Sequence, residues 1–262
     1  MNINHIIVIA ALIGFAVSSG LYLQAFATDK HRGWLTRLAQ IIFLIATCLM
    51  TYAATAAKLQ NIWSMASGFL FVSLLAWMTI GLQLFSQFKL AGTFVAPLIT
   101  LISLVHLFTI PSHSSETYAK PDLLLSWHIY TSVIGQAFGI LAAAIALLHI
   151  ILQRAVKRKQ LDRILKSGLS LNPLEKGLFS CIWLGFGFLT IGLILGAIYT
   201  QFSGSDEIEL SSKLMWALLV WLSYFVIILC RNVFRVATKK IVLMTFGSFG
   251  IMALGFFGLV DL

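Results

Sequence analysis

Histidine is the residue type in this chain whose placement points most directly to chemistry. His128 is followed by Ser132, Gly135 and Gly139, spaced so that all four lie on one face of an α-helix. Imidazole is a common axial ligand of haem iron. The two glycines let another object approach the backbone closely, either a neighbouring helix or a flat cofactor. The spacing therefore leaves two interpretations of His128 open: an iron ligand, or a histidine satisfied by an interhelical hydrogen bond.

Three further histidines are expected on the same side of the membrane as His128. They are His5 and His106, each at the end of a hydrophobic run on that side, and His113, in a loop on that side. A haem would need a second axial ligand, and His106 and His113 are the nearest candidates because one loop joins them to His128. Trp127 would form a wall of such a site, although an aromatic ring at this depth also fits an interfacial belt.

No other motif in the sequence predicts catalysis. We see no nucleophile–base pair, phosphate-binding loop or metal-ligand spacing, so we do not expect an enzyme. The cysteines form neither CxxC nor CxxCH, which excludes covalent haem attachment to this chain. The net charge of +9 comes without a basic and aromatic recognition module, so we expect no nucleic-acid partner.

The elements that must position these histidines are hydrophobic helices. Of the 262 residues, 60% are hydrophobic and 10% are charged, whereas a soluble chain is roughly 45–50% apolar and about 25% charged. Because a helical span needs about 20 apolar residues, the hydrophobic runs predict an all-α integral membrane protein with eight spans, embedded in a lipid bilayer. We place the spans at 4–26, 38–57, 62–86, 91–110, 123–152, 177–199, 214–230 and 241–260.

The distribution of Lys and Arg predicts the orientation of the spans. Of the 18 basic side chains, only Lys58, Lys120 and Lys213 fall in the loops after spans two, four and six; all the others fall in the alternate loops. Loops rich in Lys and Arg stay on the cytoplasmic side. Both termini are therefore expected on the outer (periplasmic) side. The basic stretch 153–176 is then inside, where it suits a surface helix on anionic lipid.

From about residue 123 to its end, the chain resembles the cytochrome c assembly family, the CcsA/CcmC-type haem-handling membrane proteins. Within the family it is most similar to the small eight-span branch typified by YpjD. Residues 1–122 resemble the family only as four hydrophobic spans. The matching pieces are His128-Ile129, Ser132 and Ala142-Ala143-Ala144; Asn172-Pro173-Leu174-Glu175, Gly185-Phe186, Leu189-Thr190 and Gly196; Lys213, Trp221, Tyr224 and Arg231; and Phe256-Phe257-Gly258.

The resemblance implies that haem b is held non-covalently near the outer face and passed to apocytochrome c or to other cytochrome maturation proteins. By this resemblance, His128 corresponds to the membrane histidine that ligates the iron, and Lys213 corresponds to the basic residue beside the outer-loop site. It also implies that the protein resides in the bacterial inner membrane as a multi-pass protein. The full set of candidate cofactor-binding residues is His128, His106, His113, Lys213, Ser132 and Trp127.

Two departures from the family keep other functions open. The tryptophan-rich outer motif of larger members is absent from residues 200–213, and Ser212 stands where the small branch often has a histidine. We expect one membrane domain, in which residues 1–122 form four helices and residues 123–262 form the family-like portion. The leading hypothesis is a haem-handling protein of cytochrome c biogenesis. The alternatives are a transporter or flippase of another amphipathic molecule, and a scaffold that has lost the haem ligands.

Overall fold

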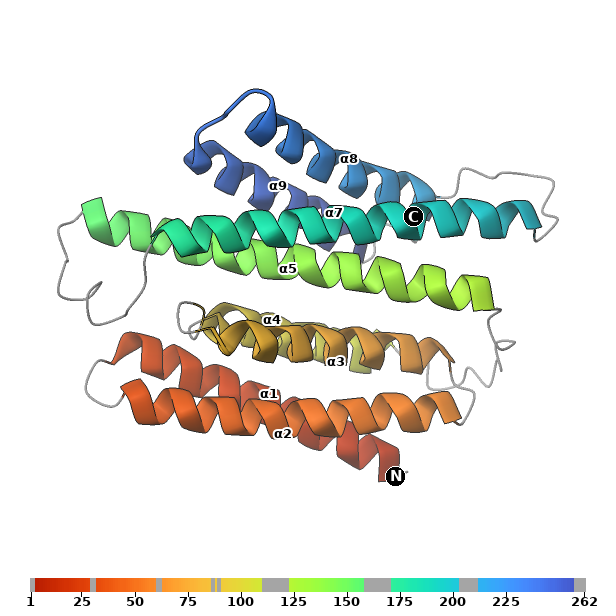
Figure 1. Ribbon diagram of the computed structural model, residues 1–262. Coiled ribbons are helices and arrows are strands. Elements are labelled where there is room, and N and C mark those ends of the chain that lie inside the picture. Colours follow the sequence, from red (N-terminus) through yellow and green to blue (C-terminus); the bar gives the residue numbers. More distant parts are fainter. Residues whose placement is uncertain are drawn as a thin grey trace. The chain divides into compact units, whose positions relative to one another are not determined.

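The structure, a computed structural model, describes residues 3–28, 32–59, 63–85, 88, 91–109, 123–157, 171–202 and 212–256. All the secondary structure of this described part is helical, apart from turns and bends. Within residues 1–120, and separately within residues 121–262, successive helices run in opposite directions (Figure 1). They are α1 (Ile3–Ala27), α2 (Arg32–Leu59), α3 (Trp63–Gln83), α4 (Gly92–Thr109), α5 (Leu123–Lys157), α7 (Leu171–Phe202), α8 (Ser212–Asn232) and α9 (Thr238–Phe256).

These helices occupy the predicted hydrophobic runs, with boundaries shifted by a few residues. α7 begins at Leu171 rather than at 177, because Pro173 fits the first turn of a helix, where the backbone N–H has no intrahelical partner. α5 continues past 152 to Lys157. Arg154 and Lys157 lie in its last turn, where cations interact favourably with the helix dipole.

Several of the helices are suited to crossing a bilayer. Two apolar helical segments, Gly68–Gln83 and Gly92–Val105, are shorter than a full span. The prediction of an all-helical membrane protein is confirmed, and the chain is a multi-pass membrane protein. Five described segments are long and apolar enough for a span: Ile6–Ala27, Gly33–Ala57, Leu123–Lys157, Leu171–Gln201 and Met215–Asn232.

The chain divides into two compact units, Met1–Lys120 and Pro121–Leu262. In the first unit, α1 packs on α2 and α4, and α3 packs on α2 and α4, which closes a ring of four helices. Phe15 and Phe43 are fully buried and meet edge to face, with ring centroids 5.3 Å apart. The buried Tyr22 hydroxyl donates a hydrogen bond to Gln83 Oε1 at 2.9 Å, so this core contains a polar contact among its aromatic rings.

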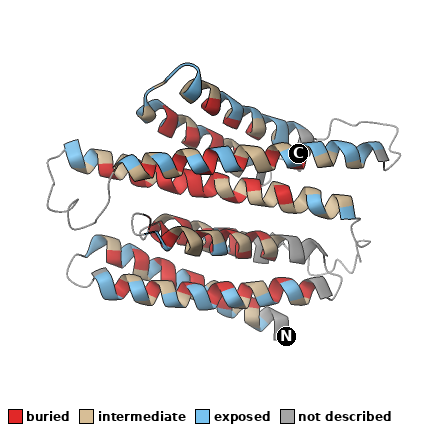
Figure 2. Cartoon of the chain, in the orientation of Figure 1, coloured by how far each residue is buried: buried red, intermediate tan, exposed pale blue. Residues whose placement is uncertain are grey.

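The second unit is also a ring of four helices, in which α5 packs on α7 and α9, and α8 packs on the same two helices. α5 is the most buried candidate span, with 67% of its apolar window covered, against 28% for α7 and 17% for α8. Figure 2 shows the buried residues concentrated along α5. Small side chains make this possible, because Ala142, Ala143 and Ala144 let the neighbouring helices approach closely.

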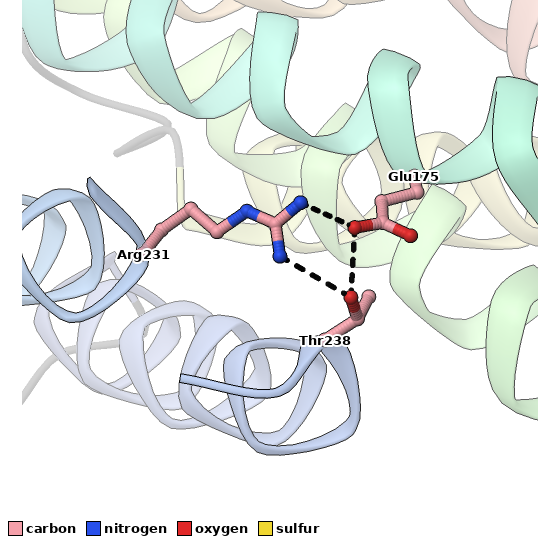
Figure 3. Close-up of polar contacts among 3 residues, drawn as sticks. All are labelled: Glu175, Arg231 and Thr238. Carbon is pink, nitrogen blue, oxygen red and sulfur yellow. Dashed lines mark hydrogen bonds and ion pairs between the residues drawn. The ribbon is translucent and has the colours of Figure 1, made fainter. Parts of the chain in front are cut away.

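A polar cluster ties together three helices at one end of the second unit. Arg231, in the last turn of α8, forms an ion pair with Glu175 of α7 at 2.5 Å. The Thr238 hydroxyl, at the start of α9, donates to the same Glu175 oxygen at 2.7 Å (Figure 3). The Arg231 guanidinium also lies over the ring of Phe179, 4.4 Å from its centroid. These contacts fix the short connection between α8 and α9 against the first turns of α7.

Candidate functional site

His128 lies near the start of α5, and its ring is held against α7. Its Nδ1 atom lies 2.7 Å from the carbonyl oxygen of Gly192. Because a carbonyl oxygen only accepts hydrogen bonds, Nδ1 carries the proton in this contact. In the neutral ring the lone pair is then on Nε2. The main chain of α7 thus selects the tautomer in which Nε2 is free to bind a metal ion, an arrangement typical of metal-ligating histidines.

The glycines of α7 make room for this contact. A Cβ atom placed on Gly196 would lie 2.8 Å from Cε1 and 2.9 Å from Nδ1 of His128. A Cβ atom on Gly192 would lie 2.6 Å from the Ser132 hydroxyl oxygen. Real Cβ atoms do not come this close to heavy atoms without displacing them. Gly192 and Gly196, four residues apart on α7, therefore form a helix-packing motif, and the residues packed into it are His128 and Ser132.

The glycines of α5 are also covered by neighbouring helices. A Cβ atom on Gly135 would lie 2.7 Å from Leu189 Cγ of α7, and one on Gly139 would collide with the Tyr224 hydroxyl of α8. The predicted face His128, Ser132, Gly135 and Gly139 is thus a real face of α5. At the two glycines, a side chain of a neighbouring helix covers the backbone, and not a flat cofactor.

Trp127 and Ser132 have different places beside the histidine. The Trp127 side chain is 56% exposed, so most of its ring lies outside the packed interface of α5 and α7. Its carbonyl oxygen accepts a hydrogen bond of 2.8 Å from the Thr131 hydroxyl. Ser132 is half-buried and packs on Gly192. Of the predicted site residues, Ser132 is the one that the structure brings into the same interhelical contact as His128.

The remaining predicted site residues are His106, His113 and Lys213, whose side chains the structure does not describe. His106 belongs to α4 and Lys213 to α8, but their side chains lie outside the described residues. His113 lies outside them altogether. The second axial ligand and the basic residue therefore stay predictions. Among the residues that the structure describes, no group of three or more His, Cys, Asp or Glu side chains could hold a metal ion.

The structure adds features that sequence reasoning missed. The Gly192 carbonyl is the partner of His128, and a main-chain oxygen leaves no signal in a sequence. At the other end of α5, His149 is only 4% exposed, and its Nδ1 has no hydrogen-bond partner within the described part of the chain. The ion pair of Arg231 with Glu175 joins residues far apart in the sequence.

The fold and the site define a multi-pass membrane protein in which one histidine is fixed between two membrane-spanning helices. The chain belongs to the cytochrome c assembly family: the profile described as "Cytochrome C assembly protein" matches residues 6–260. The match includes the four N-terminal helices, for which the sequence had shown only a hydrophobic pattern.

One curated relative shows what kind of protein shares this sequence. The chain is 28% identical over 142 residues to the "Cytochrome c biogenesis protein CcsA" of the alga Chlamydomonas reinhardtii. The alignment covers 52% of this chain and 38% of the relative, so this chain matches well under half of that protein's length. No solved structure gives a significant match.

Proposed function

We propose that this chain handles haem in the biogenesis of c-type cytochromes, with His128 as the membrane histidine that holds the iron. Membership of the cytochrome c assembly family supports a role in the biogenesis of c-type cytochromes. The single observation that supports the residue is the 2.7 Å hydrogen bond from His128 Nδ1 to the Gly192 carbonyl. It leaves Nε2 unprotonated in the neutral ring, as an axial ligand requires.

The half-buried setting of His128 fits a cargo that enters and leaves. A ring clamped by α7 keeps its orientation between binding events, so little conformational entropy is lost when the iron binds. Haem is the substrate here, and the chain supplies binding and orientation without covalent chemistry. The expected protein partner is an apocytochrome c, or another maturation protein that receives the haem.

The orientation and location belong to the same proposal. Eight spans with both termini outside would place His128 near the outer face, where cytochromes c mature in a bacterial cell. The hydrophobic pattern and the Lys and Arg distribution support this topology. The bacterial inner membrane is proposed on the family resemblance, and the algal relative shows that related proteins also occur outside bacteria.

The visible absorption spectrum of detergent-purified protein tests the haem ligand. We expect a Soret band in the wild type that is largely lost in His128→Ala. His149→Ala is the matched control, because it removes a buried histidine from the same helix, about 30 Å away along its axis. A Soret band that is kept in His128→Ala and lost in His149→Ala would show that the iron ligand is His149 rather than His128. A wild type without a band after haem is supplied during expression would instead favour a scaffold or the transport of another molecule.

A further inference from the structure

The Arg231 end of the second unit carries basic side chains that have no acidic counterpart in the described part of the unit. Glu175 is the only carboxylate side chain among those described residues, and Arg231 and Thr238 already bind it. The basic side chains at this end other than Arg231 are all exposed: Arg154 and Lys157 on α5, Lys176 on α7, and Arg235, Lys239 and Lys240 around the start of α9. This end therefore presents a concentrated positive field.

The connection between α8 and α9 adds apolar side chains to this charge. Val233 and Phe234 are 63% and 69% exposed, and Figure 2 shows most of the connection as exposed. They follow directly after Asn232, where the candidate span ends. Apolar side chains beside cations at the end of a span have the composition of a membrane-interface anchor, in which the apolar group enters the acyl boundary and the cations face the headgroups.

Arg235 has a left-handed backbone conformation that fixes where its exposed side chain leaves the chain. Its φ angle is +48°, in the left-handed region that favours glycine, and it is the one non-glycine residue of this kind in the described chain. The connection is held in this shape by Val236 N–H, which donates to the Cys230 carbonyl at 2.9 Å, and by the cluster of Arg231, Glu175 and Thr238. The bond from Val236 N–H to the Cys230 carbonyl is a capping bond of a helix C-terminus, with its left-handed residue at Arg235, so the cap holds the exposed Arg235 side chain in one place beside the end of α8.

We propose that the segment Val233–Lys240 is a binding site for anionic phospholipid, in the bilayer leaflet that surrounds this end of the second unit. Arg235, Lys239 and Lys240 face the lipid phosphate, and Val233 and Phe234 enter the acyl boundary. Charge complementarity selects an anionic headgroup, and the exposed aromatic ring selects a lipid over an acidic protein segment. This site lies at the opposite end of the second unit from His128, and it does not depend on haem binding.

Native mass spectrometry of the full chain with phosphatidylglycerol or phosphatidylcholine of identical acyl chains tests the site. We expect the wild type to retain phosphatidylglycerol preferentially. We expect R235Q/K239Q/K240Q to lose retention about tenfold or more, because these cations lie beside the exposed Val233 and Phe234, so charge and apolar contact act on the same lipid. The matched control R154Q/K157Q/K176Q removes the same charge from the same end and should keep most of the retention. Equal loss in both triple variants would show that net charge alone acts, and would overturn the site.

Arg235→Gly separates strain from charge. Glycine accepts the left-handed backbone, so this variant should be at least as thermally stable as the wild type in phosphatidylcholine. It should nevertheless gain less stability than the wild type when phosphatidylglycerol is added. The proposal would be contradicted if phosphatidylglycerol raised the thermal stability of Arg235→Gly as much as that of the wild type. It would also be contradicted if the wild type showed no preference for phosphatidylglycerol. The second result would favour an acidic protein partner for this end.

Discussion

At the residue scale, one hydrogen bond determines the orientation of His128. His128 could have been a ligand or a helix-packing residue, and the structure shows that it makes an interhelical contact through Nδ1. The two interpretations are compatible, because the imidazole has a second nitrogen. A carbonyl partner on Nδ1 orients the ring and leaves Nε2 unprotonated in the neutral ring, as the proposed iron ligand requires. The residue that forms the contact, Gly192, contributes only its main chain.

Gly196→Ala tests whether room for the ring matters. The new methyl group would lie 2.8 Å from His128 Cε1, so we expect the ring to shift, a stability loss of about 1–3 kcal/mol and a weaker Soret band. Gly187→Ala is the control on the same helix, since a Cβ atom there meets nothing within 4 Å. It should leave the spectrum unchanged and stability equal or slightly higher. Identical behaviour of the two variants in thermal unfolding and in the spectrum would contradict the packing argument.

At the scale of the helices, the sequence predicted α5 well because its face follows from helical periodicity alone. The positions of His128, Ser132, Gly135 and Gly139 on one face required only the 3.6-residue repeat. What covers that face could not be predicted. Leu189 and Tyr224 come from helices whose rotation about their own axes depends on packing, and a hydrophobic run does not specify that rotation. The ion pair of Glu175 with Arg231 was missed for the same reason.

The contact of α5 with α8 yields a prediction at this scale. Gly139→Ala should destabilise the protein by about 1–3 kcal/mol, because the new methyl group collides with the Tyr224 hydroxyl. Tyr224→Phe removes that oxygen, so the double variant should recover stability, with a coupling of about 0.5–3 kcal/mol in thermal unfolding.

Gly135→Ala provides the control for this cycle. It collides with Leu189 rather than with Tyr224, so Tyr224→Phe should not rescue it. Rescue of both glycine variants, or of neither, would mean that the Tyr224 hydroxyl does not limit the approach of α8 to α5.

At the scale of the whole molecule, hydrophobic pattern and charge predicted more than individual residues did. The runs of apolar residues located the helices, and the family match over residues 6–260 agrees with the resemblance seen in the second half. The division into two compact units at Lys120 and Pro121 falls within two residues of the point at which the family resemblance begins in the sequence. Both units close into four-helix rings, which bury the small-residue faces of their helices.

The topology can be tested with reporter fusions in a bacterial host. With both termini outside, alkaline phosphatase fused after Leu262 should be active, and phosphatase inserted within residues 158–170 should be inactive. A green fluorescent protein at the same two positions should show the reverse pattern, because it fluoresces only on the inner side. Active phosphatase in the 158–170 segment would contradict the orientation predicted from Lys and Arg.

The central claim, that His128 holds haem iron through Nε2, is tested most directly by chemical rescue. In His128→Gly the imidazole ring is gone, and free imidazole can occupy the space that it leaves. We predict that the purified variant lacks the Soret band of bound haem, and that added imidazole restores it in a saturable manner. A variant that binds haem without imidazole, or one that folds yet stays free of haem at every imidazole concentration while the wild type binds it, would contradict the claim.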